Sequence, residues 1–446
     1  MCPKTRFWFG LLLLSPLAAS AAILGTNFPA QPLTADRIAG LPAAQQPPWK
    51  DYLKRSSRQL IADQASFNTE ALEHGLTNFV APPEGRGAAG IPLNKEPSWY
   101  AGLEAARLAD NIVSYQTPAG GWSKNLDMTK HPRAPGELFA QGNASRFTNT
   151  ADFDSPMAAN WNYVGTFDND ATVTQLRFLA RVITAHGPGP QAKNQAAFMR
   201  GLEYILASQY PNGGWPQVWP LQGGYHDGVT FNDDAMINIL RLVADIAQEK
   251  PGFAFVPSGA RARAGASLER GIACILAAQI VANDHRTVWC QQYDPLTLKP
   301  ASARNYEMPS EASSESAEIM IFLMSLPKPS VKIVAAVHAA ADWFQKTRIE
   351  HASYTRGDGN PRLVENAEAG PLWARYYEIG TDRPIFGDRD KTIHDKVDDI
   401  SLERRRGYGW YRDAGASALQ VYAKWAREHP RDGRTREKTA PPAPGS

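Results

Sequence analysis

The chain has 446 residues, with 47 Lys and Arg against 45 Asp and Glu, 43% hydrophobic residues and three cysteines. This composition excludes a disordered chain and a small scaffold held by disulfides, and it supplies enough apolar residues for a core of several layers. The near balance of charge argues against a nucleic-acid-binding protein, so an anionic partner has to be bound by local groups.

The first residues are typical of an export signal. Lys4 and Arg6 precede an apolar stretch over 7–14, and residues 17–21 read Leu-Ala-Ala-Ser-Ala, which a signal peptidase accepts. The stretch is too short to cross a membrane, and no later segment has the roughly 20 apolar residues that a span needs. We therefore expect a signal peptide over 1–21 and a soluble, monomeric, secreted or periplasmic protein with no membrane or nucleic-acid partner.

Residues 22–95 come next as an N-terminal extension with Pro-rich flanks around a helix from Trp49 to Glu73. We expect this extension to pack on a main domain over 96–430. Residues 431–446 combine charges with Pro and Gly and lack an apolar stripe. This composition predicts a disordered tail.

Helical patterns in four pairs account for most of residues 96–430. In each pattern apolar residues recur at helical spacing, as Val173, Leu176, Ala180 and Ile183 do. The predicted pairs are 99–115 with 171–184, 199–209 with 235–248, a helix around 268–276 with 316–326, and 332–346 with 414–427. Strand-like alternation is scarce, so no large sheet is expected.

The loops of the first two pairs repeat. Residues 116–122 read Gln-Thr-Pro-Ala-Gly-Gly-Trp and 209–215 read Gln-Tyr-Pro-Asn-Gly-Gly-Trp, while Phe-Asp-Asn-Asp-Ala at 167–171 parallels Phe-Asn-Asp-Asp-Ala at 231–235. Duplicated helix pairs predict a mainly all-α fold, an α/α toroid-like barrel with short irregular or β segments in its rim loops. Loops joining paired helices gather at one rim, which is the expected substrate groove.

Acidic residues stand directly before two of these helices: Asp168 and Asp170 before one, Asp233 and Asp234 before the other. Capping of the helix amides explains one Asp at each place. The additional carboxylates would suit Ca²⁺ if they converge at the rim. Spacing alone leaves both interpretations open.

The two Gly-Gly-Trp turns also allow two interpretations. Glycine with a positive φ can end the helix while the Trp packs on its neighbour. Alternatively, Trp215 or Lys124, which follows the first Trp, contacts a sugar. The two interpretations are compatible.

Arginines interleaved with aromatic residues mark the later loops: Arg304 beside Tyr306, then Arg375, Arg389 and the run 404–406. A solvated surface explains the triple run. Isolated arginines at the same end of successive pairs instead favour binding of carboxylates, as in a uronate polymer. No phosphate loop, nucleophile elbow or zinc-binding H-E-x-x-H motif is present. Cys274 and Cys290 are either a disulfide or two buried thiols.

Five ordered motifs, at 212–217, 223–227, 231–236, 303–307 and 375–390, resemble those of the family 10 polysaccharide lyases, which are pectate lyases. The resemblance runs from about residue 60 to about residue 425. It implies a helical, toroid-like fold and Ca²⁺-assisted β-elimination of polygalacturonate, the de-esterified backbone of pectin, with an arginine as base.

The resemblance also assigns roles to particular residues. By motif, Arg304 takes the place of the base, Asp168 and Asp233 those of the metal ligands, with Asp170 and Asp234 as less secure alternatives. It gives Arg375 and Arg389 the role of carboxylate-binding arginines. Our further candidates for substrate binding are Lys124, Trp215, Tyr306 and Asp170.

Arginine has a pKa above about 12, and one positive charge at about 4 Å lowers it by roughly three units at an effective dielectric of 20. We therefore expect an alkaline optimum and Arg304 close to Asp168 and Asp233. Two other functions fit the same residues: a toroidal glycoside hydrolase that uses Asp168 and Asp233 as acid and base, and a pectin-binding protein without catalysis.

Overall fold

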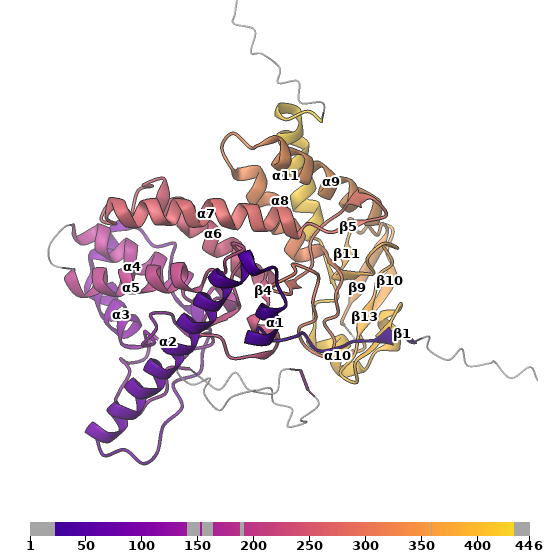
Figure 1. Cartoon of the computed structure of the whole chain (residues 1–446). Coiled ribbons are helices and arrows are strands. Elements are labelled where there is room, and N and C mark those ends of the chain that lie inside the picture. The colour runs from indigo at the N-terminus through magenta and orange to yellow at the C-terminus, as the bar shows by residue number, and fades with distance from the viewer. Residues whose placement is uncertain (1–22, 141–151, 154–163, 188–190, 358, 432–446) are drawn as a thin grey trace, which may run out of the picture.

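The computed structural model describes residues 23–140, 152–153, 164–187, 191–357 and 359–431 (Figure 1). The predicted signal peptide, and the predicted tail beyond Arg431, lie outside these residues. None of the described helices is both long enough and apolar enough to cross a membrane.

Eight long helices of the main domain form the four predicted pairs. In chain order the pairs are α3 (Leu103–Ser114) with α4 (Val173–His186), α5 (Ala192–Ser208) with α6 (Ala235–Ala247), α7 (Ser258–Ala278) with α8 (Ser313–Ser325), and α9 (Val331–Thr347) with α11 (Ala414–Glu428). The start of the first predicted helix is instead a 3-10 turn over Pro97–Ala101. The prediction of paired helices is therefore confirmed, with shifts at their ends.

The pairs stack in two layers. The second members contact one another in the order α4, α6, α8, α11, and the first members in the order α3, α5, α7, α9. The helix α6 lies in the middle of its layer, and the predicted stripe residues Met236, Ile239, Leu240 and Val243 are fully buried there. A helix that is apolar on most of its circumference is stable only when neighbours cover it, as they do here.

The stack is open rather than a closed ring. Figure 1 shows α3, α4 and α5 at one end of the molecule and α9 and α11 at the other. The expected helix pairs are thus present, but the first and last pairs lie apart (Figure 1), so a closed toroid is not confirmed. Four pairs in an arc leave two ends, and α2 (Gln46–Glu73) crosses the side of the stack (Figure 1).

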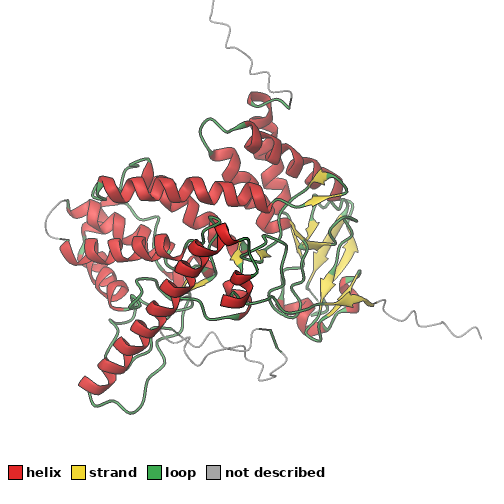
Figure 2. Cartoon of the chain, in the orientation of Figure 1, coloured by secondary structure: helices red, strands yellow, loops and turns green. Residues whose placement is uncertain are grey.

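The strands are short, and they lie in the loops between helices (Figure 2). The largest sheet in the described ranges has three antiparallel strands, in the order β1 (Ile23–Thr26), β14 (Thr392–His394) and β13 (Phe386–Gly387). The remaining strands pair two by two: β2 (Gly165–Thr166) with β3 (Val218–Trp219), β4 (Val229–Thr230) with β7 (Gln292–Tyr293), β8 (Glu311–Ala312) with β12 (Tyr376–Tyr377), β5 (Val281–Ala282) with β6 (His285–Arg286), β9 (Ala352–Thr355) with β10 (Arg362–Glu365), and β11 (Trp373–Ala374) with β15 (Tyr411–Arg412).

Three of these pairs recur at equivalent places. In β2–β3, β4–β7 and β8–β12, the segment before α4, α6 or α8 binds the loop of the following helix pair. We call these three strand pairs rungs, because each one joins the loops of two successive helix pairs at one end of the stack. They explain how side chains from different repeats come to lie side by side there.

The Gly-Gly-Trp repeat is a structural repeat with more copies than the sequence pattern shows. Four tryptophans are at most 1% exposed: Trp122, Trp215, Trp289 and Trp373. The indole N–H of each donates to a carbonyl of the first helix of its own pair, α3, α5, α7 or α9, at 2.7–3.0 Å. The last two copies lack the Gly-Gly pair, so the repeat is visible in the sequence only at the first two. The interpretation in which the Trp packs on a helix is confirmed.

The N-terminal extension lies on this stack through aromatic residues of α2. The ring centroids of Trp49 and Tyr52 lie 5.4 and 4.7 Å from that of Tyr210, and the Tyr52 hydroxyl donates to the Ser208 carbonyl at 2.9 Å. Elsewhere in the core, both described cysteines are buried free thiols. The disulfide alternative is therefore wrong.

Candidate active site

The two acidic motifs fold into tight turns ahead of α4 and α6. Asp168–Asp170 and Asn232–Asp234 each form a 3-10 turn, and no side chain caps either helix. Capping is therefore not their role. Asn169 and Asp233, at equivalent places in the repeat, have φ of 50° and 47°. This left-handed backbone is costly for residues other than glycine and is found often at functional sites.

The turns meet Arg304 at one polar cavity. Its volume is about 120 Å³, enough for an ion and several waters. We call it the site cavity; its lining residues are Lys124, Asp168, Asn169, Gln217, Tyr225, Asn232, Asp233, Gln292, Ala303, Arg304 and Glu307. The expectation that Arg304 lies close to Asp168 and Asp233 is confirmed, and the rungs β2–β3 and β4–β7 place the loops for it.

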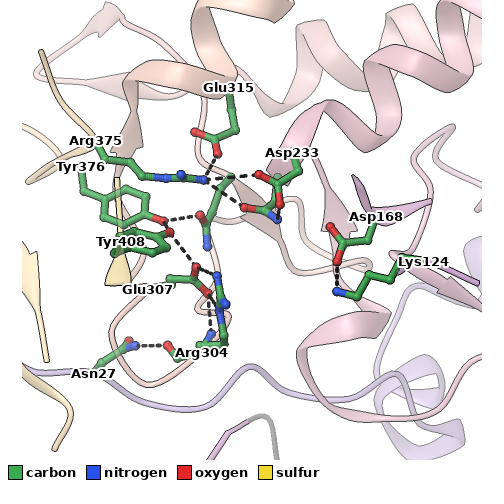
Figure 3. Close-up of polar contacts among 12 residues, drawn as sticks. Asn27, Lys124, Asp168, Asp233, Arg304, Glu307, Glu315, Arg375, Tyr376 and Tyr408 are labelled. Atoms are coloured by element: carbon green, nitrogen blue, oxygen red, sulfur yellow. Dashed lines mark hydrogen bonds and ion pairs between the residues drawn. The ribbon is translucent and has the colours of Figure 1, made fainter. Parts of the chain in front are cut away.

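Asp168 is the buried anion of this cavity. It is 4% exposed and pairs with Lys124 (Figure 3). Burial raises the pKa of Asp168, but the charge and hydrogen bond of Lys124 outweigh burial, and the net pKa is lowered. Asp168 is therefore ionised at neutral pH.

Asp233 behaves differently although it faces the same cavity. Burial, followed by repulsion from Asp168, raises the pKa of Asp233 to about 6. The nearest cation is Arg375, whose Nη2 lies 4.0 Å from Asp233 Oδ1. Two carboxylates that repel each other across a small polar cavity form a place where a cation is favourable.

The residues present fit Ca²⁺ in part. Asp168 Oδ1 and Gln217 Oε1 are buried and accept no hydrogen bond from the described residues, and oxygen atoms of this kind are the ligands Ca²⁺ prefers. No group of three or more His, Cys, Asp or Glu side chains in the described ranges is placed to hold a metal. A calcium ion here would thus take Asp168, Asp233 and amide oxygens, with water or substrate completing its coordination.

Arg304 is held by Glu307 from its own loop. Arg304 Nε donates to Glu307 Oε2 at 2.8 Å, and Nη2 donates to Oε1 (Figure 3). Burial lowers the pKa of Arg304, but the charge of Glu307 outweighs burial and raises it well above the usual value. We expected a neighbouring cation to lower this pKa, with nearby carboxylates cancelling part of the effect. Here the carboxylate of Glu307 dominates, and the direction is reversed.

Glu307 belongs to a buried network behind the arginine. Burial raises its pKa, but Arg304 outweighs burial and brings the pKa to about 2. The Tyr408 hydroxyl donates to Glu307 Oε1 at 2.7 Å, and its oxygen lies 2.5 Å from that of Tyr376. Nε and Nη2 thus face Glu307, which leaves Nη1 as the guanidinium nitrogen that no described residue occupies.

Arg375 does not line the site cavity but contacts Asn232, which does. It is 8% exposed, and its Nη2 binds Glu315 Oε1 at 2.6 Å and Asn232 Oδ1 at 3.2 Å. The guanidinium carbon also lies 4.8 Å from the ring centroid of Tyr408. Arg375 therefore orients the Asn232–Asp233 turn in this structure, and its charge is already balanced by Glu315.

Tyr306 lies beside Arg304, and Arg389 contacts the same aromatic ring; neither lines the site cavity. Arg389 comes from the β13–β14 turn, and its Nε binds Glu403 Oε2 at 3.1 Å. Tyr306 is 2% exposed, and the guanidinium carbons of Arg304, Arg389 and Arg404 lie 4.4–5.3 Å from its ring centroid. The assignment of Tyr306 as a sugar contact is corrected: the ring supports the arginines.

Two further assignments change. Trp215 is 1% exposed and its indole N–H is used inside the protein, so its face cannot stack on a sugar. Asp170 is exposed and outside the site cavity, where its Oδ1 accepts from Asn238 at 2.6 Å. Lys124 does line the cavity, as expected, and it does so as the partner of Asp168.

Sequence reasoning gave no role to Glu307, Glu315 and Tyr408. For Glu307 a signal existed, because a charge opposite to Arg304 stands three residues later in the same motif. Glu315 and Tyr408 bind residues 60 and 101 positions away, so no local pattern could reveal them.

A family model described as pectic acid lyase matches residues 116–419. Among solved structures, a family 10 polysaccharide lyase from Cellvibrio cellulosa is 32% identical and superposes with a TM-score of 0.63, covering 77% of this chain and 99% of its own. A mutant of a family 10 polysaccharide lyase from the same organism, in complex with trigalacturonic acid, gives 32% identity, a TM-score of 0.62 and coverage of 76% and 98%. No curated protein matches.

The paired helices, the site cavity and these likenesses define a polysaccharide lyase. More than half of the chain matches the family model, and the chain belongs to the pectic acid lyase family: it is a pectate lyase. This activity removes the glycoside hydrolase and the non-catalytic binding protein as interpretations.

Proposed function

We propose that the enzyme cleaves polygalacturonate at the site cavity by β-elimination, with Arg304 as base and Ca²⁺ held by Asp168 and Asp233. The observation that carries this proposal is that Arg304 and both aspartates line one cavity. A relative of similar fold binds trigalacturonic acid, which supports a uronate polymer as the substrate.

The chemistry explains why a base and cations are needed together. The base removes the proton from C5, beside the carboxylate, and the electron pair of that C–H bond is left on C5. As the C4–O bond breaks, this pair forms the C4–C5 double bond, and the departing oxygen leaves with the C–O pair and takes a proton. The products are a new chain end and a 4,5-unsaturated oligogalacturonide. The main energetic cost is the negative charge that develops on C5 next to the carboxylate, and nearby cations lower this cost.

Each group of this chain then has a defined task. Bound Ca²⁺ would supply positive charge next to the uronate carboxylate. Lys124 keeps Asp168 ionised, and Arg375 lies close enough to Asp233 to favour its ionised form. Arg389, whose guanidinium contacts the same Tyr306 ring as that of Arg304, is the cation we assign to a uronate carboxylate of the polymer.

Arg304 receives the C5 proton at Nη1, the guanidinium nitrogen that Glu307 does not occupy. It can do so only from its neutral form, which is scarce because Glu307 raises the pKa of Arg304. The rate is therefore expected to rise with pH into the alkaline range.

One assay tests the proposal. With polygalacturonate, the enzyme should generate ultraviolet absorbance from the unsaturated ends, and a chelator should abolish it. Arg304→Ala should remove this activity while trigalacturonate still binds. Products without ultraviolet absorbance would refute elimination, and a fully active Arg304→Ala would refute Arg304 as the base.

We also propose export of the enzyme as a monomer. Lys4, Arg6, the apolar stretch over 7–14 and the small residues over 17–21 support cleavage near residue 21. The N-terminal sequence and the mass of the protein recovered outside the producing cells are the measurements; an intact residue 1 in that fraction would refute cleavage.

A further inference from the structure

The N-terminal strand ends against the loop that carries Arg304. The residue after β1, Asn27, is 3% exposed. Its Nδ2 donates to the carbonyl of Arg304 at 3.2 Å (Figure 3) and to the carbonyl of Asn305 at 3.0 Å. These contacts join residues 277 and 278 positions apart. A buried amide that donates both hydrogens to one loop fixes the path of that loop.

The other end of the same amide is also used. Asn27 Oδ1 accepts from the Ser302 hydroxyl at 2.6 Å and from the backbone N–H of Phe28 at 3.0 Å. The backbone N–H of Asn27 donates to the Lys391 carbonyl at 2.8 Å, in the turn between β13 and β14. Asn27 therefore binds both flanks of Arg304 and is itself anchored to a sheet.

The anchor extends to the second loop of the site. Asn305 Nδ2 donates to the Arg389 carbonyl at 2.7 Å. Through Asn27 and Asn305, the turn that carries Arg389 and the loop that carries Arg304 are held in one arrangement. This arrangement has no regular strand or helix over 301–310 to maintain it.

We propose that Asn27 is a positioning residue for Arg304, and that the N-terminal strand is a working part of the active site. The inference rests on the proposed role of Arg304. Proton transfer requires the base within hydrogen-bond reach of C5, and a displacement of about 1 Å can cost about 100-fold in rate. Asn27 precedes residues 116–419, the segment that the family model matches. We call Asn27 and its contacts with the Arg304 loop the strap.

The test is Asn27→Ala in the mature chain, measured beside Ser302→Ala. We expect Asn27→Ala to lower kcat on polygalacturonate by about 10- to 100-fold with KM within about twofold, because the loop is displaced while the cations remain. Ser302→Ala, which removes only one of the bonds, should lower kcat less. The double variant should be no worse than Asn27→Ala, since both act through one contact.

Thr34→Ala is the matched control, because Thr34 lies in the same extension but its hydroxyl only caps α1 (Ala35–Ala39). It should leave kcat unchanged. A purely structural role for Asn27 would predict parallel losses of kcat and of trigalacturonate binding, and additive effects of the two substitutions. Either result overturns the proposal.

Arg304→Ala, measured in parallel, separates this inference from the proposed function. If Arg304→Ala is inactive while Asn27→Ala and Ser302→Ala behave like Thr34→Ala, the strap is refuted and the base stands. If Arg304→Ala is fully active, the base is refuted and the strap with it. Should Asn27→Ala not fold, the kcat and KM of Ser302→Ala decide alone.

Discussion

The pair formed by Arg304 and Glu307 sets the working pH of the enzyme in our proposal. A guanidinium bound at two nitrogens by a buried carboxylate is a poor base, because the carboxylate stabilises the charged form. The same two bonds orient Nη1. Glu307 therefore improves the placement of the base and reduces the fraction of it that is neutral.

Glu307→Gln separates these two effects. The amide keeps an acceptor for Arg304 but removes the negative charge, so the pKa of Arg304 falls and the neutral base appears at lower pH. The rise of kcat with pH should move down by about one to three units, the size expected for one charge at about 4 Å.

The measurement is kcat against pH for both proteins. Glu403→Gln serves as the control, because Glu403 binds Arg389 and Arg404 rather than Arg304. That substitution should leave the pH dependence of kcat in place. An unmoved profile for Glu307→Gln would mean that Arg304 is not the titrating base.

At the scale of elements, the Gly-Gly-Trp turns after α3 and α5 depend on their first glycine. Gly120 and Gly213 have φ of 106° and 92°. A Cβ on Gly120 would lie 2.6 Å from the carbonyl oxygen of Arg200 in α5, and one on Gly213 would lie 2.1 Å from that of Arg270 in α7. The glycines allow the turn to approach that helix closely enough for the Trp to be buried.

Gly213→Ala should lower the free energy of unfolding by at least about 2 kcal/mol, from left-handed strain together with the clash against Arg270. Denaturant unfolding measures it. Gly259→Ala, in α7 with nothing within 4 Å of the added methyl, should be neutral or stabilising by up to about 1 kcal/mol. Equal effects of the two substitutions would contradict the packing argument.

A buried carboxylate on the helix α2 makes the free energy of unfolding depend on pH. Asp63 is fully buried, its Oδ1 accepts from Gln59 at 2.7 Å, and burial raises its pKa to about 7. The folded state therefore binds this proton more tightly than the unfolded chain does. Stability is highest below about pH 4 for this group and falls as pH rises towards 7.

Asp63→Asn should remove that fall. The amide keeps an acceptor for Gln59 and carries no charge, so the variant should be more stable than the parent by about 2–4 kcal/mol at pH 8 and similar to it at pH 4. Asp51→Asn, exposed on the same helix, is the control and should leave the pH dependence unchanged. Thermal unfolding at both pH values decides, and equal gains at both would contradict the account.

For the whole molecule, the open arc of helix pairs explains where the active site lies. Rungs β2–β3 and β4–β7 bring the starts of α4 and α6 beside the loops of the next pairs. The site cavity is thereby made from several repeats, with no repeat supplying it alone. Binding of a cation there is expected to stabilise the folded molecule as a whole.

Calcium at 100 times its Kd should raise the free energy of unfolding by about 2.7 kcal/mol. Asp168→Asn should abolish the gain, and Asp245→Asn, whose carboxylate pairs with Arg177 and Lys250 elsewhere, should keep it. Lowering the pH below about 6 should weaken the effect, because Asp233 becomes protonated. The readout is the melting temperature with and without the ion, and a calcium-independent value would refute the site.

Part of the site could be predicted from sequence because it lies in short motifs. Asp168, Asp233 and Arg304 stand in local patterns of charge and turn residues, and the structure brings them together. The assignment of Trp215 and Tyr306 as sugar contacts was wrong. The sequence around an aromatic residue in a loop does not show whether its side chain faces solvent or packs inward. The partners Glu315, Tyr408 and Asn27 gave no local signal, because each contacts residues far away in sequence.

By itself the sequence determined the helix pairs, since the period of apolar residues is a local consequence of helix geometry, and the family, since five ordered motifs are specific. The tertiary structure decided that the arc stays open, that an anion rather than a cation controls Arg304, and that the N-terminal strand reaches the active site. These depend on charges and hydrogen bonds between segments up to 278 residues apart, and such distances are fixed only when the chain is folded.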